Sequence, residues 1–457
     1  MMRARAATAA FLLFALALGG CATNLTPGLA RLSREHAAVS HQVPVIIVPG
    51  LMGSRLADRE SGVEAWPGST RKLLTSGYLN LALRIDPVTL EPRDDGLVAT
   101  GLFDAAAGLD FYHKVVTTLQ EVGGYRRGHP GEPVTDHEAR FYAFAYDWRQ
   151  DNIITVRALD ALIEQIRRDY GDPDLRVDII AHSMGGLSVR YYERYGTVDV
   201  LEGNYFPVTG AGARKLRRVV LLGTPNEGSV SAIHYFLNGY QVGLSRLPNV
   251  GVVTMPSTYQ LFPHPQSNWI TTIRGAPLRL DQFDSEVWRR FGWSVFDENV
   301  RRRIARHPGI WPAPDVFERY FKKHLERARR FVWSLDVPVG NVKLVEPLLL
   351  GGDCVPTPAR LVMEEVGRNS MARLVPEQIL RPVRGIDYDR LMYEPGDGSV
   401  TKASLLGEHP FEPPGSQREH SDIEFDRSYF VCEQHDKLTG NAHFREKLLD
   451  FLLSPGN

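Results

Sequence analysis

The stretch Val177–Gly186, VDIIAHSMGG, places one serine between an apolar run and a pair of glycines. The apolar run is typical of a buried strand, and the helical spacing of Leu187, Tyr191 and Tyr195 follows the glycines directly. A serine between a strand and a helix, with a small residue two positions away on each side, has the form of a nucleophile elbow. The alternative interpretation is a structural turn. Because a strand and a helix flank the serine, we favour the elbow and predict that Ser183 is a nucleophile.

Apolar runs elsewhere in the chain predict further strands, and helical periodicity fills the gaps between them. Several runs are nearly continuous, as expected when helices cover both faces of a parallel sheet. The pattern predicts the α/β class with a mostly parallel, doubly wound sheet, and with the elbow it predicts an α/β-hydrolase fold. The predicted strands are Pro44–Val48, Arg140–Tyr146, Leu175–Ala181, Arg218–Gly223, Val342–Leu350 and Arg427–Cys432.

One long segment interrupts this alternation of strands and helices. It holds five of the seven tryptophans, namely Trp269, Trp288, Trp293, Trp311 and Trp333. We interpret it as an inserted cap or lid. The expected organisation is a signal peptide at 1–20, a tether at 21–42, hydrolase core at 43–225, the cap at 226–341 and the rest of the core at 342–457.

Composition and charge are those of an ordinary globular protein. Of the 457 residues, 43% are hydrophobic and 23% are charged. The 53 basic and 54 acidic residues give a formal net charge of -1. Because no global positive field exists to attract a polyanion, we expect no nucleic-acid partner.

The N-terminus has the features of an export signal. Arg3 and Arg5 precede the apolar run Ala9–Leu18, which is too short to span a bilayer as a mature helix. The following Leu-Gly-Gly-Cys resembles a bacterial lipobox, in which Cys21 would be lipidated. The alternative is an ordinary cleaved signal. We therefore expect an exported lipoprotein of the cell envelope, facing the periplasm or in the outer membrane.

The two remaining cysteines, Cys354 and Cys432, have no metal-ligand spacing, and we expect no metal site. An oxidising compartment permits one disulfide between them. Two unpaired thiols are an equal alternative from the sequence.

A serine nucleophile of this fold needs an acid and a histidine downstream, in that order. Among the C-terminal histidines, His409, His420, His435 and His443, we choose His435 because it follows a predicted strand and precedes the last helix. The acid is open between Asp353, directly after a strand, and Asp397 in YEPGDGSV. Either carboxylate could hold the tautomer of an imidazole.

The glycine-bracketed turn after the first strand, VPGLMGS, lies where such a fold places its first oxyanion donor. Backbone N–H groups of the turn Pro49–Gly53 are candidates for this role. A plain exit from the strand is the alternative interpretation.

Several motifs together resemble the lecithin:cholesterol acyltransferase family, which includes lysosomal phospholipase and phospholipid:diacylglycerol acyltransferase. In chain order these are VPGLMGS, AYDWR, AHSMGG, GTPNEGS, VPTP and YEPGDGSVTKASLL. The resemblance implies that Ser183 is the nucleophile, Asp397 the acid and His435 the base. It also implies that the backbone N–H groups of Leu51 and Met184 are the oxyanion donors. The YDWR residues are expected to be structural.

The resemblance implies hydrolysis or transfer of a fatty-acyl group of a phospholipid through an acyl-enzyme, without a cofactor. Water as the second substrate gives hydrolysis, and a lipid alcohol gives acyl transfer. Two alternatives remain: a general lipase or carboxylesterase of the same fold, and a non-catalytic lipid-binding lipoprotein.

The predicted cap is dense in basic residues. Such clusters are most often solvated helix faces. A second hypothesis is contact with anionic lipid headgroups at a membrane, to which a lipid anchor at Cys21 would bring the cap. The residues are Arg289, Arg290, Arg301, Arg302, Arg303, Arg306, Lys322, Lys323, Arg327, Arg329 and Arg330.

Overall fold

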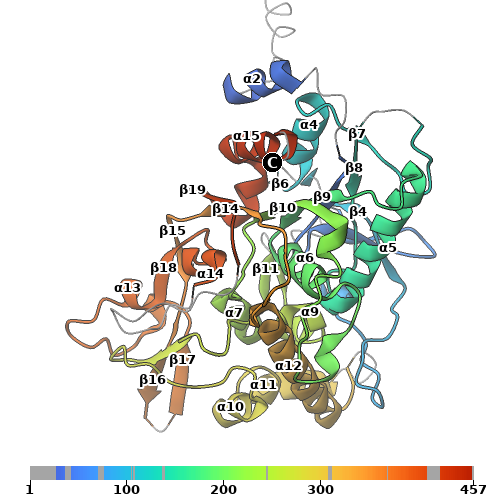
Figure 1. Cartoon of the computed structure of the whole chain (residues 1–457). Coiled ribbons are helices and arrows are strands. Elements are labelled where there is room, and N and C mark those ends of the chain that lie inside the picture. The colour runs from blue at the N-terminus through green and yellow to red at the C-terminus, as the bar shows by residue number, and fades with distance from the viewer. Residues whose placement is uncertain are drawn as a thin grey trace, which may run out of the picture.

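The computed structural model describes residues 27–36, 43–69, 77–103, 105–106, 109–135, 139–242, 245–306, 311–367, 369–408 and 423–454. At its centre lies a seven-stranded sheet in which every neighbouring pair is parallel (Figure 1). In spatial order the strands are β19 (Arg427–Val431), β14 (Leu348–Gly352), β10 (Leu216–Leu222), β9 (Val177–His182), β1 (Val45–Val48), β8 (Arg140–Ala143) and β7 (Arg126–Arg127).

All six strands predicted from the sequence belong to this sheet, and only the short edge strand β7 was not predicted. Two boundaries differ by three residues or more: the strand predicted to end at Tyr146 ends at Ala143, and the strand predicted from Val342 begins at Leu348. Pro347 has no N–H to give to a sheet ladder, and it precedes the first paired residue.

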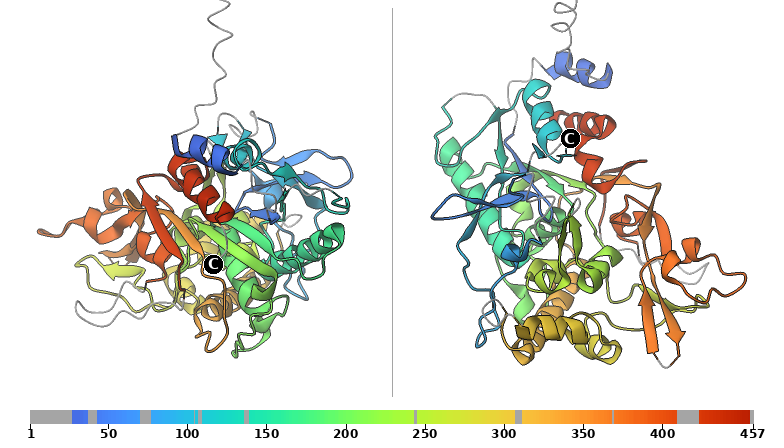
Figure 2. Two further views of the ribbon diagram at one scale, coloured as in Figure 1. Left: turned by 45° about the horizontal axis from the view of Figure 1, so that its top comes forward. Right: turned by 180° about the vertical axis from the view of Figure 1, so that it is seen from behind.

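Helices cover both faces of the sheet, since alternate side chains of each strand enter different cores. Along β1, Ile46 and Val48 pack in one hydrophobic cluster, while Val45 and Ile47 pack in the other. The first cluster includes α5 (Asn152–Tyr170) and α6 (Met184–Tyr195). The second includes α2 (Pro27–His36), α4 (His113–Glu121) and α15 (Ala442–Leu453), and Figure 2 shows these three side by side.

The segment 226–341, here called the cap, contributes none of the described strands of the central sheet. Four of its five tryptophans are buried, and Trp333 is half-buried. The cap tryptophans therefore pack the interior and do not form an exposed lipid-facing surface. The elements of the cap are α7 (Val230–Asn238), β11 (Tyr240–Val242), β12 (Ser245–Leu247), α8 (Asn249–Val252), α9 (Pro256–Tyr259), β13 (Ile270–Thr272), α10 (Ser285–Phe291), α11 (Glu298–Arg306) and α12 (Pro314–Asp336).

Smaller sheets surround the core and the cap. A three-stranded sheet joins cap strand β13 to β16 (Leu361–Val366) and β17 (Asn369–Arg373), and β15 (Val355–Pro358) pairs antiparallel with β18 (Tyr393–Gly396). The remaining elements are β2 (Ser54–Asp58), β3 (Glu64–Trp66), β4 (Leu97–Leu102), β5 (Ala105–Ala106), β6 (Leu109–Asp110), α13 (Tyr388–Met392) and α14 (Lys402–Leu406).

The proposed signal peptide and Cys21 lie outside the described residues. Within the segment expected to be a tether, α2 packs on α15 through buried Leu29 and Leu32. In the described part of the chain, no helix is both long and apolar enough to cross a membrane.

Candidate active site

Ser183 occupies the turn between β9 and α6 with φ 53° and ψ -128°. A positive φ is unusual for a residue with a Cβ, and such strain is concentrated at functional sites. The turn is also crowded. A Cβ on Gly185 would lie 2.4 Å from the carbonyl oxygen of Pro49, and one on Gly50 would lie 2.7 Å from the Cβ of Ser183. Glycine at both positions lets the loop after β1 approach the serine closely.

His435 is the first residue of a 3₁₀-helix, His435–Gly440, that follows β19. Its Nε2 is 2.9 Å from the Ser183 Oγ, although the two residues are 252 positions apart. The parallel sheet brings them together, because the carboxyl ends of β9 and β19 lie at the same edge. An imidazole in this position can accept the hydroxyl proton of the serine.

Asp397 completes the chain of contacts. Its Oδ2 is 2.7 Å from the His435 Nδ1, and its Oδ1 accepts hydrogen bonds from the backbone N–H groups of Ser399 at 2.9 Å and Val400 at 2.7 Å. The carboxylate is buried, with 1% of the residue exposed. The backbone N–H of His435 also donates to the Asp397 carbonyl at 2.8 Å. Hydrogen bonds thus hold both the carboxylate and the backbone carbonyl of Asp397, and they fix the aspartate against the imidazole.

Strand pairing explains how Asp397 reaches this place. β15 continues from the end of β14, and β18 returns antiparallel along it, with Val355 opposite Gly396. Asp397, the next residue, therefore arrives beside the end of β14, where a generic α/β hydrolase carries its acid. Asp353 lies at that end but forms an ion pair with Lys402 at 3.0 Å.

The structure does not bring the other C-terminal histidines to the serine. His443 is exposed on α15, with its ring 6.4 Å from that of Tyr429. His409 and His420 lie outside the described residues.

The electrostatics of His435 reflect two opposing effects. Burial lowers its pKa, but the negative charge of Asp397 and the hydrogen bond to it outweigh burial and raise the pKa above 6.5. The imidazolium form, which would exist after proton transfer from the serine, is therefore stabilised in this site.

The loop Pro49–Ser54, here called the oxyanion loop, is held by aromatic side chains. Tyr146 Oη donates to the Pro49 carbonyl at 2.7 Å, Trp66 Nε1 to the Met52 carbonyl at 2.8 Å and Trp148 Nε1 to the Ser54 carbonyl at 3.0 Å. The loop closes with a Gly53 N–H to Gly50 carbonyl bond, and Met52 has a φ of 61°. The candidate donor Leu51 is at the tip of this turn and is half-buried.

Sequence reasoning expected the YDWR residues to be structural and did not foresee what they hold. Tyr146 precedes Asp147 in this motif, and both Tyr146 and Trp148 anchor the oxyanion loop. Arg149 is fully buried and forms ion pairs with Asp95 at 2.6 Å and Asp147 at 2.8 Å. The signal that could have found these contacts is the conjunction of the motif with the glycine turn after the first strand.

Cys354 and Cys432 form a disulfide, which resolves the question that the sequence left open. Cys354 follows the end of β14, and Cys432 follows the end of β19. The bridge therefore ties together the two strand ends that support Asp397 and His435.

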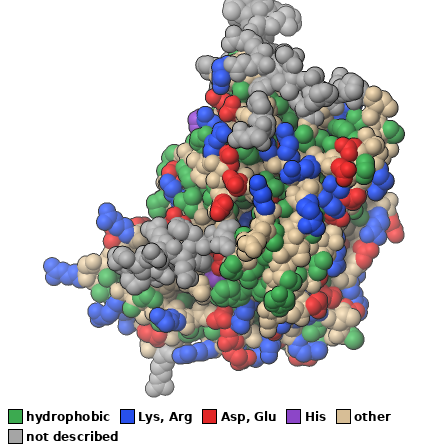
Figure 3. All heavy atoms as spheres, viewed as in Figure 1, with side chains coloured by type: hydrophobic (Ala, Val, Ile, Leu, Met, Phe, Trp, Pro, Cys, Tyr) green, Lys and Arg blue, Asp and Glu red, His purple; other side chains and the backbone are tan. Residues whose placement is uncertain are grey.

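Of the eleven residues in the predicted basic cluster of the cap, six are paired with carboxylates and three others line a surface hollow. The paired residues are Arg289 and Arg301 with Glu318, Lys323 with Glu91, Arg327 with Asp151 and Asp199, Arg329 with Asp281, and Arg330 with Glu326. No carboxylate of the described residues pairs with Arg302, Arg303 or Arg306, which line a surface hollow on α11 together with Asn299. On the face drawn in Figure 3, basic and acidic side chains are intermixed.

Comparisons with known proteins agree with this architecture. The model of one family, lecithin:cholesterol acyltransferase, matches residues 69–306, which is just over half of the chain and includes Ser183. No curated protein sequence matches the chain significantly. Among solved structures, a chain of the Tle4–Tli4 complex is similar with a TM-score of 0.55 and 14% identity, over 90% of this chain and 98% of that one.

Two lipase structures also match. Mature lipase BlEst2 of Bacillus licheniformis has a TM-score of 0.34 and 12% identity, over 91% of this chain and 93% of that one. Lipase 1 of Pelosinus fermentans has a TM-score of 0.34 and 12% identity, over 91% and 100%. The central parallel sheet with helices on both faces confirms the predicted α/β-hydrolase fold.

Proposed function

Because the chain belongs to the lecithin:cholesterol acyltransferase family, we propose that it cleaves fatty-acyl esters of phospholipids through an acyl-enzyme on Ser183. Family membership supports a lipid acyl hydrolase or acyltransferase as the general activity. The observation that carries the finer proposal is the continuous contact from Ser183 Oγ to His435 Nε2, at 2.9 Å, and from His435 Nδ1 to Asp397, at 2.7 Å.

In this proposal His435 takes the proton of Ser183 as the oxygen attacks the ester carbonyl. The negative charge that develops on the carbonyl oxygen is stabilised by the backbone N–H groups of Leu51 and Met184. The imidazolium then gives its proton to the departing alcohol, the lysophospholipid, and the acyl group remains on the serine. Water or a second alcohol, deprotonated by His435, attacks the acyl-enzyme and releases a fatty acid or a new ester.

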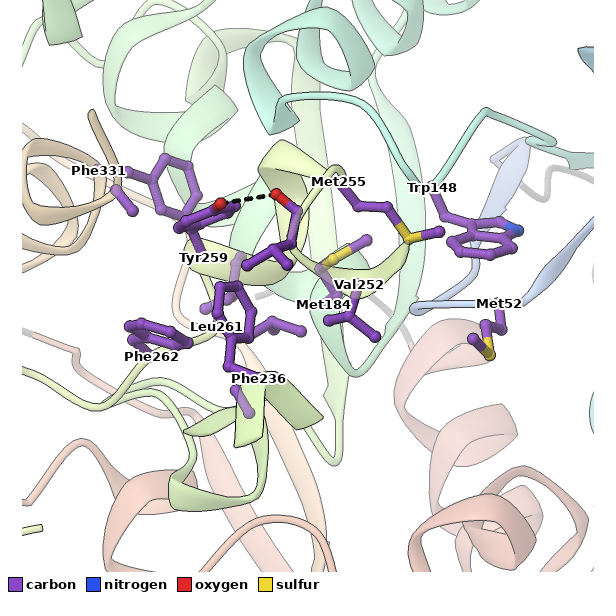
Figure 4. Packing of buried hydrophobic residues seen from close by; sticks show 14 of the residues in the cluster. Met52, Trp148, Met184, Phe236, Val252, Met255, Tyr259, Leu261, Phe262 and Phe331 are labelled. Atoms are coloured by element: carbon purple, nitrogen blue, oxygen red, sulfur yellow. Dashed lines mark hydrogen bonds between the residues drawn. The ribbon is translucent and has the colours of Figure 1, made fainter. Parts of the chain in front are cut away.

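The surroundings of the serine suit an acyl chain. Met52 follows the proposed donor Leu51, and Met184 is itself the other proposed donor. Both methionine side chains belong to the same buried cluster as Val252 and Met255 of the cap (Figure 4). Met184 is fully buried and Met52 is 6% exposed. The packing between these two methionines and the cap is thus apolar, which is the kind of surrounding that an acyl group requires.

We also propose that the protein acts at a membrane surface after export. Two features support this: the signal-like N-terminus with Cys21, and the arginines of α11 that have no carboxylate partner among the described residues. The anionic headgroups of lipids are the expected partners of these arginines.

One experiment separates the acyl proposal from its alternatives. One portion of the purified protein is labelled with a fluorophosphonate. A second, unlabelled portion is incubated with a phospholipid and a lipid alcohol, and free fatty acid is separated from new ester. We expect labelling of the first portion and acyl release by the second in the wild type, and neither in Ser183→Ala. A protein that labels but whose unlabelled portion cleaves only short-chain esters would indicate a carboxylesterase. An unlabelled protein would favour a non-catalytic lipid-binding lipoprotein.

A further inference from the structure

A buried tyrosine hydroxyl lies between the oxyanion loop and the serine turn. Tyr112 directly precedes α4 and is 2% exposed. Its Oη accepts a hydrogen bond from the Gly50 N–H at 3.0 Å and lies 2.8 Å from the Nδ1 of His182. One hydroxyl, carried by a third segment of the chain, therefore contacts both segments that surround the nucleophile.

The direction of these bonds follows from the available hydrogens. The Gly50 amide can only donate, so the hydroxyl oxygen of Tyr112 accepts there. Its own hydrogen is then available to His182 Nδ1 when that nitrogen is unprotonated. Burial, with a further contribution from the charge of His435, lowers the pKa of His182 to about 3. His182 is therefore a neutral ring, and it does not compete with His435 for the serine proton.

His182 also touches the base. It is the residue before Ser183, and its ring centroid is 5.1 Å from that of His435 at an interplanar angle of 34°. The ring is 7% exposed, so its orientation is set by protein contacts. The hydrogen bond with Tyr112 fixes the Nδ1 edge of the His182 ring, and the ring itself lies against the ring of His435. A rotation of His182 would displace the imidazole that acts on the serine.

The Gly50 bond acts on the opposite side of the nucleophile. The bond to Tyr112 fixes the Pro49–Gly50 peptide plane, and the Gly53 N–H bond to the Gly50 carbonyl fixes the next plane, which carries the Leu51 N–H. The bonds from Tyr146 and Trp66 hold the two ends of the same turn. Of these anchors, Tyr112 is the one whose hydroxyl also contacts His182, the last residue of β9.

We propose that Tyr112 and His182 are positioning residues that lock the oxyanion loop to the serine turn. In this proposal neither residue touches the substrate. They hold the Leu51 amide and the His435 ring in the correct position relative to Ser183. This inference rests on the proposed function, because the relative position of these groups affects a rate only if Ser183 attacks an acyl group. A misplacement of about 1 Å can cost roughly a hundredfold in rate.

Kinetics of two single variants and their double variant test the lock. Tyr112→Phe keeps the ring and removes the hydroxyl, so we expect kcat on a soluble short-chain ester to fall about 10- to 100-fold with KM changed less than about threefold. His182→Phe leaves the Gly50 bond intact and is expected to cost less than Tyr112→Phe. The double variant is expected to be no slower than Tyr112→Phe, because the same link is already broken.

Tyr125→Phe is the matched control. Tyr125 is 1% exposed, and its hydroxyl has no hydrogen-bond partner among the described residues, so the substitution removes an equally buried hydroxyl that bonds nothing. We expect its kcat to equal that of the wild type. An independent readout is the ¹⁵N spectrum of the histidine rings, in which Tyr112→Phe is expected to shift the Nδ1 signal of His182, because that nitrogen loses its hydrogen-bond partner.

The outcomes separate the two proposals. If the wild type labels with a fluorophosphonate and Tyr112→Phe has the kcat of Tyr125→Phe, the lock is wrong and the proposed function stands. If the two single losses multiply in the double variant, the residues act independently, and the lock is also wrong. A wild type that does not label overturns the proposed function, and the kinetic role of Tyr112 falls with it.

Discussion

Asp397, and not Asp353, lies against the imidazole of His435, with 2.7 Å between Oδ2 and Nδ1. Asp353 instead forms a half-exposed ion pair with Lys402. We predict that Asp397→Asn lowers kcat by roughly 10³- to 10⁴-fold, because the amide stabilises neither the tautomer nor the imidazolium. Asp353→Asn, the matched control, is expected to change kcat less than about threefold, as for other exposed pairs. Steady-state ester hydrolysis checks both, and a reversed order would assign the acid to Asp353.

The raised pKa of His435 predicts the acid limb of the pH profile. The base must be neutral to accept a proton, so kcat/KM of the wild type is expected to fall as the pH drops through a value above 6.5. In Asp397→Asn the favourable charge is lost and burial remains, so the limb is expected to move below 6.5. Measuring residual kcat/KM of both proteins between pH 5 and 9 tests this, and an unmoved limb would contradict it.

The free energy of unfolding also depends on the protonation of the His435 ring. Because the folded-state pKa of His435 lies above its ordinary value, the protonated ring stabilises the fold. This contribution is fully present below pH 6.5 and is lost as the pH rises through the folded-state pKa. We predict that His435→Gln abolishes this particular pH dependence, which chemical denaturation of the two proteins at a series of pH values would detect. The same pH dependence of the unfolding free energy in both proteins would contradict the prediction.

The elbow and most of the core could be predicted from the sequence because their requirements are local. Four of the six residues of β9 are apolar, and the small residues at 181 and 185 are needed within two positions of Ser183. His435 could be chosen because it follows a strand and precedes a helix, which is again a local pattern.

The acid and the anchors of the oxyanion loop depend on contacts that are distant in the sequence. Asp353 directly follows the apolar strand β14, and it is the pairing of β15 with β18 that brings Asp397 to His435 instead. Tyr112 is 62 residues from Gly50 and 70 from His182, and nothing in the residues around it indicates a partner. The resemblance to a family implied that Asp397 is the acid, and Asp397 lies against His435. The resemblance implied nothing about Tyr112.

Gly185 is predicted to tolerate no side chain. A Cβ there would lie 2.4 Å and 2.8 Å from the backbone oxygens of Pro49 and Val48, which cannot move without shifting the oxyanion loop. We expect Gly185→Ala to lower the free energy of unfolding by about 1–3 kcal/mol and also to lower kcat. Gly203→Ala is the control, since a Cβ there meets no atom within 4 Å. Urea denaturation and ester hydrolysis of both variants provide the measurement, and equal results would refute the steric argument.

The disulfide is predicted to stabilise the second half of the core. It closes a separation of 78 residues, so replacing Cys354 and Cys432 by serine is expected to lower the free energy of unfolding by about 2–5 kcal/mol. Denaturation of the wild type with and without reductant should reproduce the effect, and the double serine variant should not respond to reductant. An unchanged denaturation midpoint in both tests would show that the bridge contributes nothing.

The arginines of the α11 hollow are predicted to contact anionic membranes. Arg302, Arg303 and Arg306 have no carboxylate partner among the described residues, whereas Arg289 and Arg301 share Glu318. Charge reversal of the first three is therefore expected to weaken binding to phosphatidylserine-containing vesicles, by roughly 1 kcal/mol for each arginine lost.

Arg329→Glu serves as the control for this surface. Arg329 is already paired with Asp281, so less of its positive charge is available to a membrane. Vesicle co-sedimentation at two salt concentrations measures both proteins. The attraction should weaken as salt rises, since the Debye length shortens from about 10 Å at 0.1 M toward about 3 Å at 1 M. Binding that survives reversal of all three arginines would show that α11 is a solvated helix face and that any membrane contact is made elsewhere.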